Sequence, residues 1–172
     1  MFLACAAFAL LIFAARALGH ILPPPEALHA LHLTDCALPC WMGITPGQTS
    51  YEEALRRVEA AYPQAVIVQP TQIFVEYLLD SSFGSAVLGI SDGQVDSIYL
   101  DLGDVEGIAL GDAALLYGVP PCVVDEPPLI LFYDSPPGYG ALVARGEALE
   151  RWRQPLDRIE SRLDEHLTCP RP

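Results

Sequence analysis

Two cysteines separated by three residues, Cys36 and Cys40, are the residues of this chain best suited to chemistry. Such a pair can exchange with other disulfides, bind a metal or close a disulfide bond, depending on the redox state of the compartment. Thiol–disulfide enzymes usually place two residues between their cysteines, at a helix N-terminus that lowers the thiol pKa. Here there are three, and Pro39 precedes the second cysteine. A structural disulfide is therefore the favoured interpretation.

A metal site is the alternative hypothesis for the same region. His29, His32, Cys36 and Cys40 are spaced three, four and four residues apart, and two histidines with two cysteines form a legitimate zinc set. On one straight helix, however, the four side chains would extend over about 16 Å, too far to converge on one ion. A metal-handling or thiol-redox protein built on these four residues stays open as an alternative function.

Two further patterns resemble functional motifs. Gly89-Ile90-Ser91-Asp92-Gly93 matches G-x-S-x-G, but a nucleophile elbow needs a strand, a sharp turn and then a helix. The residues after Gly93 alternate like a strand, so Asp92-Gly93 is better explained as a hairpin turn. The second pattern is acidic: Asp101, Asp104 and Glu106 could hold Ca²⁺. They lack the EF-hand spacing, and a solvated acidic turn is favoured.

The composition excludes several classes of protein. All nine basic residues are Arg, and without Lys the chain cannot form a P-loop or a pyridoxal phosphate Schiff base. No G-x-G-x-x-G follows a strand and no H-E-x-x-H is present, so we expect no cofactor and no catalytic residues. The formal net charge is -13, which repels nucleic acid phosphates. We expect no nucleic-acid partner and no enzymatic activity.

The N-terminus predicts export. Residues 1–15 carry no charge, and Ala15-Arg16-Ala17 supplies an A-x-A cleavage pattern. We expect residues 1–22 to be a signal peptide or, if uncleaved, a membrane anchor. The protein would then be extracytoplasmic, either secreted or anchored to the outer face of the cell membrane. The sequence Phe2-Leu3-Ala4-Cys5 resembles a lipobox but stands too near the start to follow an apolar region, so lipidation is in doubt.

The remaining cysteines agree with export. Beyond Cys5 there are four, namely Cys36, Cys40, Cys122 and Cys169. An even number in an exported chain suggests disulfides, although four cysteines allow three pairings. If Cys36 bonds to Cys40, then Cys122 and Cys169 remain to pair with each other. Such a second bond would tie down the C-terminal end of the chain.

The first half of the chain predicts a helix followed by a sheet. After a linker and short helix at 23–35, Pro46-Gly47 fits a type II turn. Ser50 and Glu53 form a capping box for a helix that Pro63 ends. The apolar stripe of that helix consists of Tyr51, Ala54, Leu55, Val58, Ala61 and Tyr62. Strands are then predicted at 65–69, 71–80, 85–91 and 94–102.

The second half follows the same outline. A short helix, a strand beginning at Cys122 and a hairpin around Pro136-Pro137-Gly138 come in that order. A last helix is predicted from Pro155, with Leu156, Ile159, Leu163 and Leu167 at helical spacing. The predicted fold is α+β, an antiparallel sheet with helices on one face, built as a loose tandem repeat of helix-plus-hairpin units. We expect one domain at 36–170, with sub-units at 36–104 and 105–170.

Four short patterns carry a resemblance. They are "PCW-GITPG-T---EA", "L--YGVPP-VV", "L-LFYDSP-G" and a closing "CP". Together they resemble a group of uncharacterised exported bacterial proteins, often lipoproteins, over residues 36–170. More distantly, the chain is similar to the repeats of SmpA/OmlA lipoproteins and of β-lactamase-inhibitor-type domains. The resemblance implies a helix-on-sheet module that binds other proteins.

The function expected from all these patterns is a non-catalytic extracytoplasmic module. Its partner would be another protein or a component of the cell envelope, with the membrane added if the N-terminal segment is retained. An enzyme inhibitor of the β-lactamase-inhibitor type is a further alternative. That alternative predicts acidic and aromatic side chains exposed together, for instance Tyr133, Asp134 and Tyr139 on one hairpin.

Overall fold

A computed structural model describes most of the chain between Pro25 and Arg162. The described residues are 25–63, 66–69, 71–79, 82–102, 108–118, 120, 122–124, 129–135, 138–144 and 156–162. The predicted export segment at 1–22, two of the acidic residues (Asp104 and Glu106) and Cys169 lie outside them. No helix within these ranges is both long enough and apolar enough to cross a membrane.

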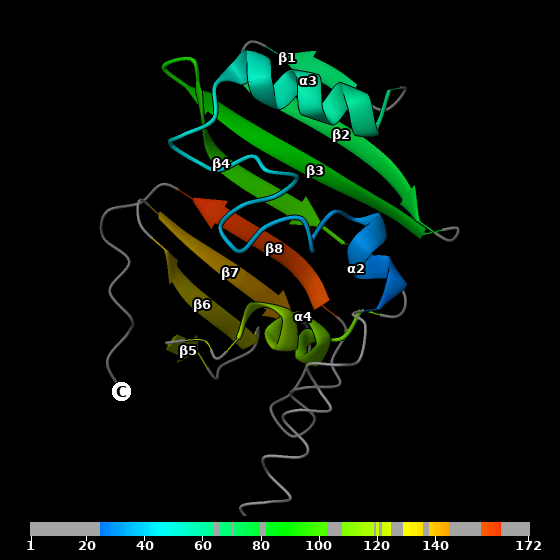
Figure 1. Cartoon of the computed structure of the whole chain (residues 1–172), viewed down its shortest axis with the longest axis vertical. Coiled ribbons are helices and arrows are strands. Elements are labelled where there is room, and N and C mark those ends of the chain that lie inside the picture. The colour runs from blue at the N-terminus through cyan, green and yellow to red at the C-terminus, as the bar shows by residue number, and fades with distance from the viewer. Residues whose placement is uncertain are drawn as a thin grey trace, which may run out of the picture.

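The described strands form one antiparallel sheet of eight. They are β1 (Val66–Gln69), β2 (Gln72–Leu79), β3 (Ser82–Ser91), β4 (Gln94–Asp101), β5 (Cys122–Val124), β6 (Leu129–Ser135), β7 (Gly138–Ala144) and β8 (Leu156–Arg162). Their order across the sheet is β1-β2-β3-β4-β8-β7-β6-β5. The last strand of each half, β4 or β8, therefore lies at the centre, and the two halves join along this pair (Figure 1).

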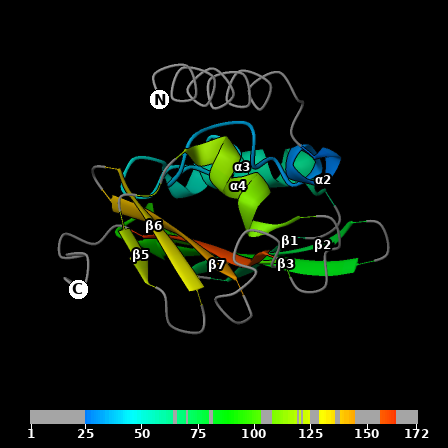
Figure 2. The same ribbon diagram turned by 90° about the horizontal axis from the view of Figure 1, so that it is seen from below.

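The helices lie on one face of this sheet (Figure 2). They are α2 (Glu26–Ala30), α3 (Tyr51–Ala61) and α4 (Leu110–Tyr117). This arrangement confirms the predicted α+β fold with an antiparallel sheet and helices on one face. Among the described elements, one helix precedes four strands twice, with α3 before β1–β4 and α4 before β5–β8.

Helix α3 follows the local signals in its sequence. The side chain of Ser50 accepts a hydrogen bond from the backbone N–H of Glu53 at 3.3 Å, which satisfies one of the free donors of the first turn. The carboxylate of Glu53 forms ion pairs with Arg56 and Arg57, three and four residues further along the same helix. Ala54 and Val58 are fully buried, as the apolar stripe predicts.

The β3–β4 hairpin turns at Asp92-Gly93, as predicted. Both residues have positive φ, 50° and 75°, as a two-residue type I′ turn requires. The tip of the hairpin is bonded to the start of α3, because the N–H of Tyr51 donates to Gly93 O at 3.0 Å. Two residues further along, the N–H of Val95 donates to Thr49 O, also at 3.0 Å. The hairpin and the helix cap therefore hold each other in place.

The core lies between the sheet and the helices. Ile73 and Val75 on β2, two residues apart, are fully buried, as expected for one face of the strand predicted at 71–80. The buried residues of the central strands include Leu100 and Ile159, which are register partners. Leu28, Leu31 and Leu33 from the N-terminal segment belong to the same core cluster.

The predicted C-terminal helix is wrong over its described part, because Leu156–Arg162 is strand β8. Leu156 and Ile159 are both buried, and their three-residue spacing suggested a helix. A register shift at Val143/Ala144 explains this spacing, since Val143 pairs with Arg158 and Ala144 pairs with Leu156. Such a bulge lets two residues three apart face the same side of a sheet. Leu163 and Leu167 lie outside the described residues.

Candidate functional site

The predicted disulfide between Cys36 and Cys40 is confirmed. Their Cα atoms lie 5.8 Å apart, within the range that a disulfide spans without distortion. The bond sits in the segment of residues 31–50, which we call the bridging segment. In Figure 1 this segment crosses in front of β4 and β8, between α3 and α4. Both cysteines are half-buried.

Trp41 anchors the bridging segment beside α3. Its side chain is 2% exposed, and its indole N–H donates to Leu31 O at 2.8 Å. The ring stacks on Tyr62, the C-terminal cap residue of α3, with ring centres 6.3 Å apart. Trp41 is therefore buried beside α3, the helix that begins after Ser50.

The bridging segment also contacts the second half of the fold. Leu38, inside the disulfide loop, packs on β7, where a Cβ at Gly140 would come within 2.9 Å of the Leu38 Cβ atom. The hydroxyl of Tyr117, at the end of α4, donates to Leu33 O at 2.8 Å. Because Gly47 N–H donates to Val95 O on β4, the segment connects the two halves on the helix-covered face.

A tight turn follows the disulfide. Trp41 and Ile44 exchange backbone hydrogen bonds of 3.0 and 2.7 Å, and Met42 and Gly43 between them have φ of 55° and 74°. Two central residues with positive φ form a type I′ turn. A Cβ at position 43 would collide with the guanidinium of Arg57, so both the backbone and the available space require glycine there. The next turn, Pro46-Gly47, also has positive φ at its glycine, 72°, as a type II turn requires.

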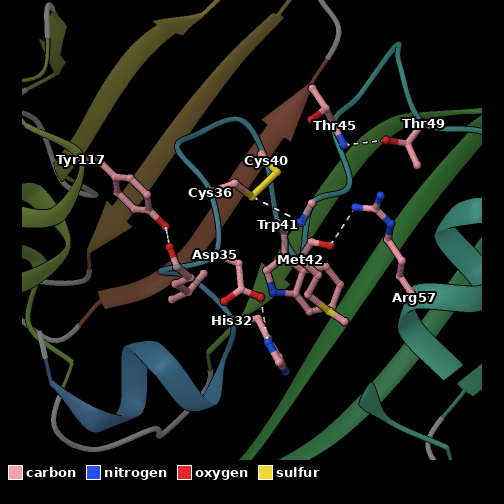
Figure 3. Close-up of a disulfide and its surroundings, with 12 residues drawn as sticks. His32, Asp35, Cys36, Cys40, Trp41, Met42, Thr45, Thr49, Arg57 and Tyr117 are labelled. Carbon is pink, nitrogen blue, oxygen red and sulfur yellow. Dashed lines mark hydrogen bonds and ion pairs between the residues drawn. A yellow bond between two sulfur atoms is a disulfide. The ribbon is translucent and has the colours of Figure 1, made fainter. Parts of the chain in front are cut away.

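One peptide group of the Met42–Gly43 turn has partners on both sides (Figure 3). Its carbonyl, Met42 O, accepts from Arg57 Nη1 at 3.2 Å. Its N–H, on Gly43, donates to Cys36 Sγ at 3.4 Å. The guanidinium of Arg57 is held in turn by Glu53, with Nε to Oε1 at 2.6 Å. A cation on α3 is therefore linked to one sulfur of the disulfide through a single peptide.

The four residues of the alternative metal site do not converge. Cys36 and Cys40 bond to each other, and bonded sulfurs are not the thiolates that a metal requires. His29 Nδ1 lies 2.7 Å from Thr34 Oγ1, and His32 Nδ1 lies 2.9 Å from Asp35 Oδ2. Within the described ranges, no three or more His, Cys, Asp or Glu side chains are arranged to hold a metal ion.

Tyr62 is the described group with a strongly shifted pKa. Burial, and secondarily the charge of Asp35, raises the pKa of Tyr62 from 10.0 to about 12. Its ring also contacts His32 edge-on, with centroids 6.1 Å apart. The protonated phenol is thus favoured in the folded state, so the folded protein holds this proton more tightly than the unfolded chain does.

We expect this shift to make stability depend on pH in the alkaline range. The contribution of Tyr62 is fully present below about pH 10 and is lost as the pH rises through about 12. The chain has no Lys, Arg keeps its charge in this range, and the six tyrosines other than Tyr62 are the same in the wild type and in Tyr62→Phe. Urea unfolding between pH 9 and 12 should show a steeper loss in the wild type than in Tyr62→Phe. Parallel curves for the two proteins would contradict the assignment.

Cys122, on strand β5, is also disulfide-bonded. Since Cys36 and Cys40 bond to each other, the chain offers Cys5 or Cys169 as its partner, and both lie outside the described residues. The predicted pairing with Cys169 therefore stays a prediction. Cys122 lies on the edge strand of the sheet, where a covalent bond would restrain fraying.

The two weaker motifs have structural roles where they are described. Ser91 ends β3 and the next two residues turn the chain into β4, so the G-x-S-x-G pattern is a hairpin and lacks the strand–turn–helix geometry of a nucleophile elbow. Asp101 is the last residue of β4. Its predicted companions in an acidic cluster, Asp104 and Glu106, lie outside the described residues.

The opposite face of the sheet carries a set of residues that sequence reasoning missed. Arg158, Glu160 and Arg162 alternate along β8 on the side away from buried Ile159, and Tyr99 is the register partner of Glu160 on β4. We call the surface formed by these four residues the helix-free face, because no described helix packs on it (Figure 2). The period-two pattern of charges at 158–162 was a usable signal, but the prediction of a helix there concealed it.

Ion pairs and a ring contact order this surface. Glu160 Oε1 lies 3.0 Å from Arg158 Nε and its Oε2 lies 3.6 Å from Arg162 Nη2. The guanidinium carbon of Arg158 lies 5.9 Å from the centre of the Tyr99 ring, a cation–π arrangement. Tyr133, Asp134 and Tyr139, expected together on one hairpin, lie on β6 and β7. The structure describes the backbone of these three residues and not their side chains.

Comparison with known proteins adds no relative, because no family model, curated protein or solved structure matches this chain.

Proposed function

We propose that this protein is a non-catalytic extracytoplasmic module that binds a protein or cell-envelope partner through its helix-free face. The observation that carries the proposal is that the described helices all lie on the same face of the sheet (Figure 2). The helices and the bridging segment fill one face, while β4 and β8 present Tyr99, Arg158, Glu160 and Arg162 on the other.

The composition of this face suits protein recognition. Arg and Tyr are enriched among the residues that dominate protein–protein binding energy. The side chain of Arg162 is 54% exposed, and that of Glu160 is 17% exposed between the two arginines. Because the four side chains stand on strands at the centre of the sheet and hold one another, little conformational entropy is lost on binding.

The cysteines support an oxidising location. Cys36, Cys40 and Cys122 are all disulfide-bonded, and such bonds persist mainly in exported proteins of mesophiles. An uncharged apolar segment at 1–15 is consistent with export. Together these features support a partner among secreted or envelope proteins.

Site-specific photo-cross-linking tests the binding face. A photoreactive residue at position 99 or 162 should give the same discrete adduct with an envelope protein, and Arg158→Glu should abolish it. The control position is 115 on α4, whose leucine is 76% exposed on the helix-covered side. Adducts of equal yield from position 115, or none from 99 and 162, would contradict the proposal.

Inhibition of an enzyme of the β-lactamase class is a more specific form of the same proposal. It is favoured by the pairing of an aromatic and an acidic residue, Tyr99 and Glu160, on the helix-free face. The purified chain should slow hydrolysis of a chromogenic cephalosporin by a β-lactamase, and Tyr99→Ala should relieve the inhibition at least tenfold. Unchanged hydrolysis at micromolar chain would remove this candidate and leave the general binding proposal standing.

A further inference from the structure

The two sulfurs of the Cys36–Cys40 bond have different surroundings. Cys36 Sγ accepts the N–H of Gly43 at 3.4 Å, and the carbonyl of the same peptide group accepts from Arg57 at 3.2 Å. Within the described part of the chain, no hydrogen bond reaches the sulfur of Cys40. The disulfide is therefore electrostatically asymmetric, although the two cysteines are only four positions apart.

The asymmetry favours negative charge on one sulfur. A cation that bonds to a peptide carbonyl polarises the peptide, which makes its N–H a stronger donor on the opposite side. A donor N–H and a nearby guanidinium are features that stabilise a cysteine thiolate. In thiol–disulfide exchange the sulfur that is more stable as a thiolate leaves faster. Cys36 is therefore the better leaving group, and Cys40 is the sulfur open to attack.

We propose that Cys36–Cys40 is a thiol–disulfide exchange site that accepts electrons from a dithiol reductant, with Cys36 as the leaving thiolate. One thiolate of the reductant attacks Cys40 Sγ, and the bond between the two protein sulfurs breaks. The second thiolate of the reductant then attacks the first sulfur of the reductant, which is bonded to Cys40 in the mixed disulfide, and Cys40 leaves as a thiolate. Two electrons pass to the protein, and the two protons of the dithiol end on Cys36 and Cys40.

Reduction would act on the bridging segment. The disulfide loop contains Leu38, whose side chain is 7% exposed and packs against Gly140 on β7. Trp41 and the Met42–Gly43 turn follow directly. Opening the bond removes the constraint that orders this loop against the second half of the fold. The site thus extends the binding proposal with a redox-sensitive element on the opposite, helix-covered face, and it does not depend on the identity of the binding partner.

Peptide-resolved alkylation tests the asymmetry. In the full chain, Cys40→Ser leaves the Cys36 thiol and Cys36→Ser leaves the Cys40 thiol, and each is titrated with iodoacetamide against pH. The pH midpoint for Cys36 should lie about one unit or more below that for Cys40. Mass spectrometry identifies the labelled peptide, which separates these thiols from Cys5, Cys122 and Cys169. Equal midpoints, or a lower one for Cys40, would overturn the proposal.

Two arginine variants test the role of the cation. Arg57→Gln should raise the Cys36 midpoint, because it removes the charge bonded to Met42 O. Arg56→Gln is the matched control, since Arg56 has the same charge and pairs with the same Glu53 but is 74% exposed. An equal shift in both variants, or none in Arg57→Gln, would show that the peptide link does not act as proposed.

Glutathione and hydrogen exchange complete the test without relying on those variants. Glutathione added to the wild type should form its mixed disulfide on Cys40, whereas a mixed disulfide on Cys36 would overturn the assignment. The double variant Cys36→Ser/Cys40→Ser, which mimics the reduced site, should lose amide protection at Trp41 and Ile44 and keep it on β4. Unchanged protection at Trp41 would show that the bond does not order the bridging segment.

Discussion

Replacing Trp41 with alanine should lower the free energy of unfolding by about 3–5 kcal/mol, the usual cost of removing a large buried aromatic side chain. The indole is 2% exposed, stacks on Tyr62 and donates to Leu31 O at 2.8 Å. Its loss opens a cavity between α3 and the bridging segment and leaves a buried carbonyl without its donor. Urea unfolding followed by far-ultraviolet circular dichroism measures the change.

Trp41→Phe separates packing from hydrogen bonding. Phenylalanine keeps most of the ring contact with Tyr62 but cannot donate to Leu31 O, so we expect a cost of about 1–3 kcal/mol. A cost below 1 kcal/mol for Trp41→Ala would show that the bridging segment is not held by this residue.

Replacing Cys122 with serine should lower the thermal midpoint by about 8–20 °C under oxidising conditions. Cys122 is disulfide-bonded, and a bond to Cys169 or to Cys5 would close a loop of about 50 or about 120 residues. The loss of loop-closure entropy in the unfolded chain corresponds to about 4–5 kcal/mol. By the same reasoning the five-residue loop between Cys36 and Cys40 contributes only about 2 kcal/mol. Differential scanning calorimetry measures the midpoint.

Two further variants identify the partner of Cys122. Cys169→Ser should reproduce the effect of Cys122→Ser if the predicted pairing is correct, and Cys5→Ser should then have none. The opposite result would assign the bond to Cys5. In a reducing buffer the wild type and Cys122→Ser should melt together, and a difference that persists there would point to packing at β5 as the cause.

The elements that the sequence predicted well are those with local signals. Ser50, the Asp92-Gly93 turn and the Pro46-Gly47 turn each set the backbone through their own side chain or their own φ preference. Such preferences act over two to four residues and need no distant partner. The Cys36–Cys40 bond belongs to the same class, because its two ends are four positions apart.

The elements that the sequence predicted poorly depend on distant partners. Leu156–Arg162 is a strand because β4 and β7 provide backbone hydrogen bonds on both of its edges. These hydrogen bonds outweigh the helical spacing of Leu156 and Ile159. Three residues of the helix-free face, Arg158, Glu160 and Arg162, lie on this strand. Because a helix was predicted there, the three residues were not predicted as part of a candidate site.

The sequence alone determined the α+β class, the first helix-and-sheet half, the hairpin turns and the Cys36–Cys40 disulfide. Only the tertiary structure decided that β4 pairs with β8 and that Arg57 reaches Cys36 through the Met42–Gly43 peptide. The reason is physical: caps, turns and short disulfides are properties of neighbouring residues. Strand pairing and the hydrogen bonds that link Arg57 to Cys36, by contrast, join residues that are distant in the chain. How closely such residues approach is determined by how the whole core packs.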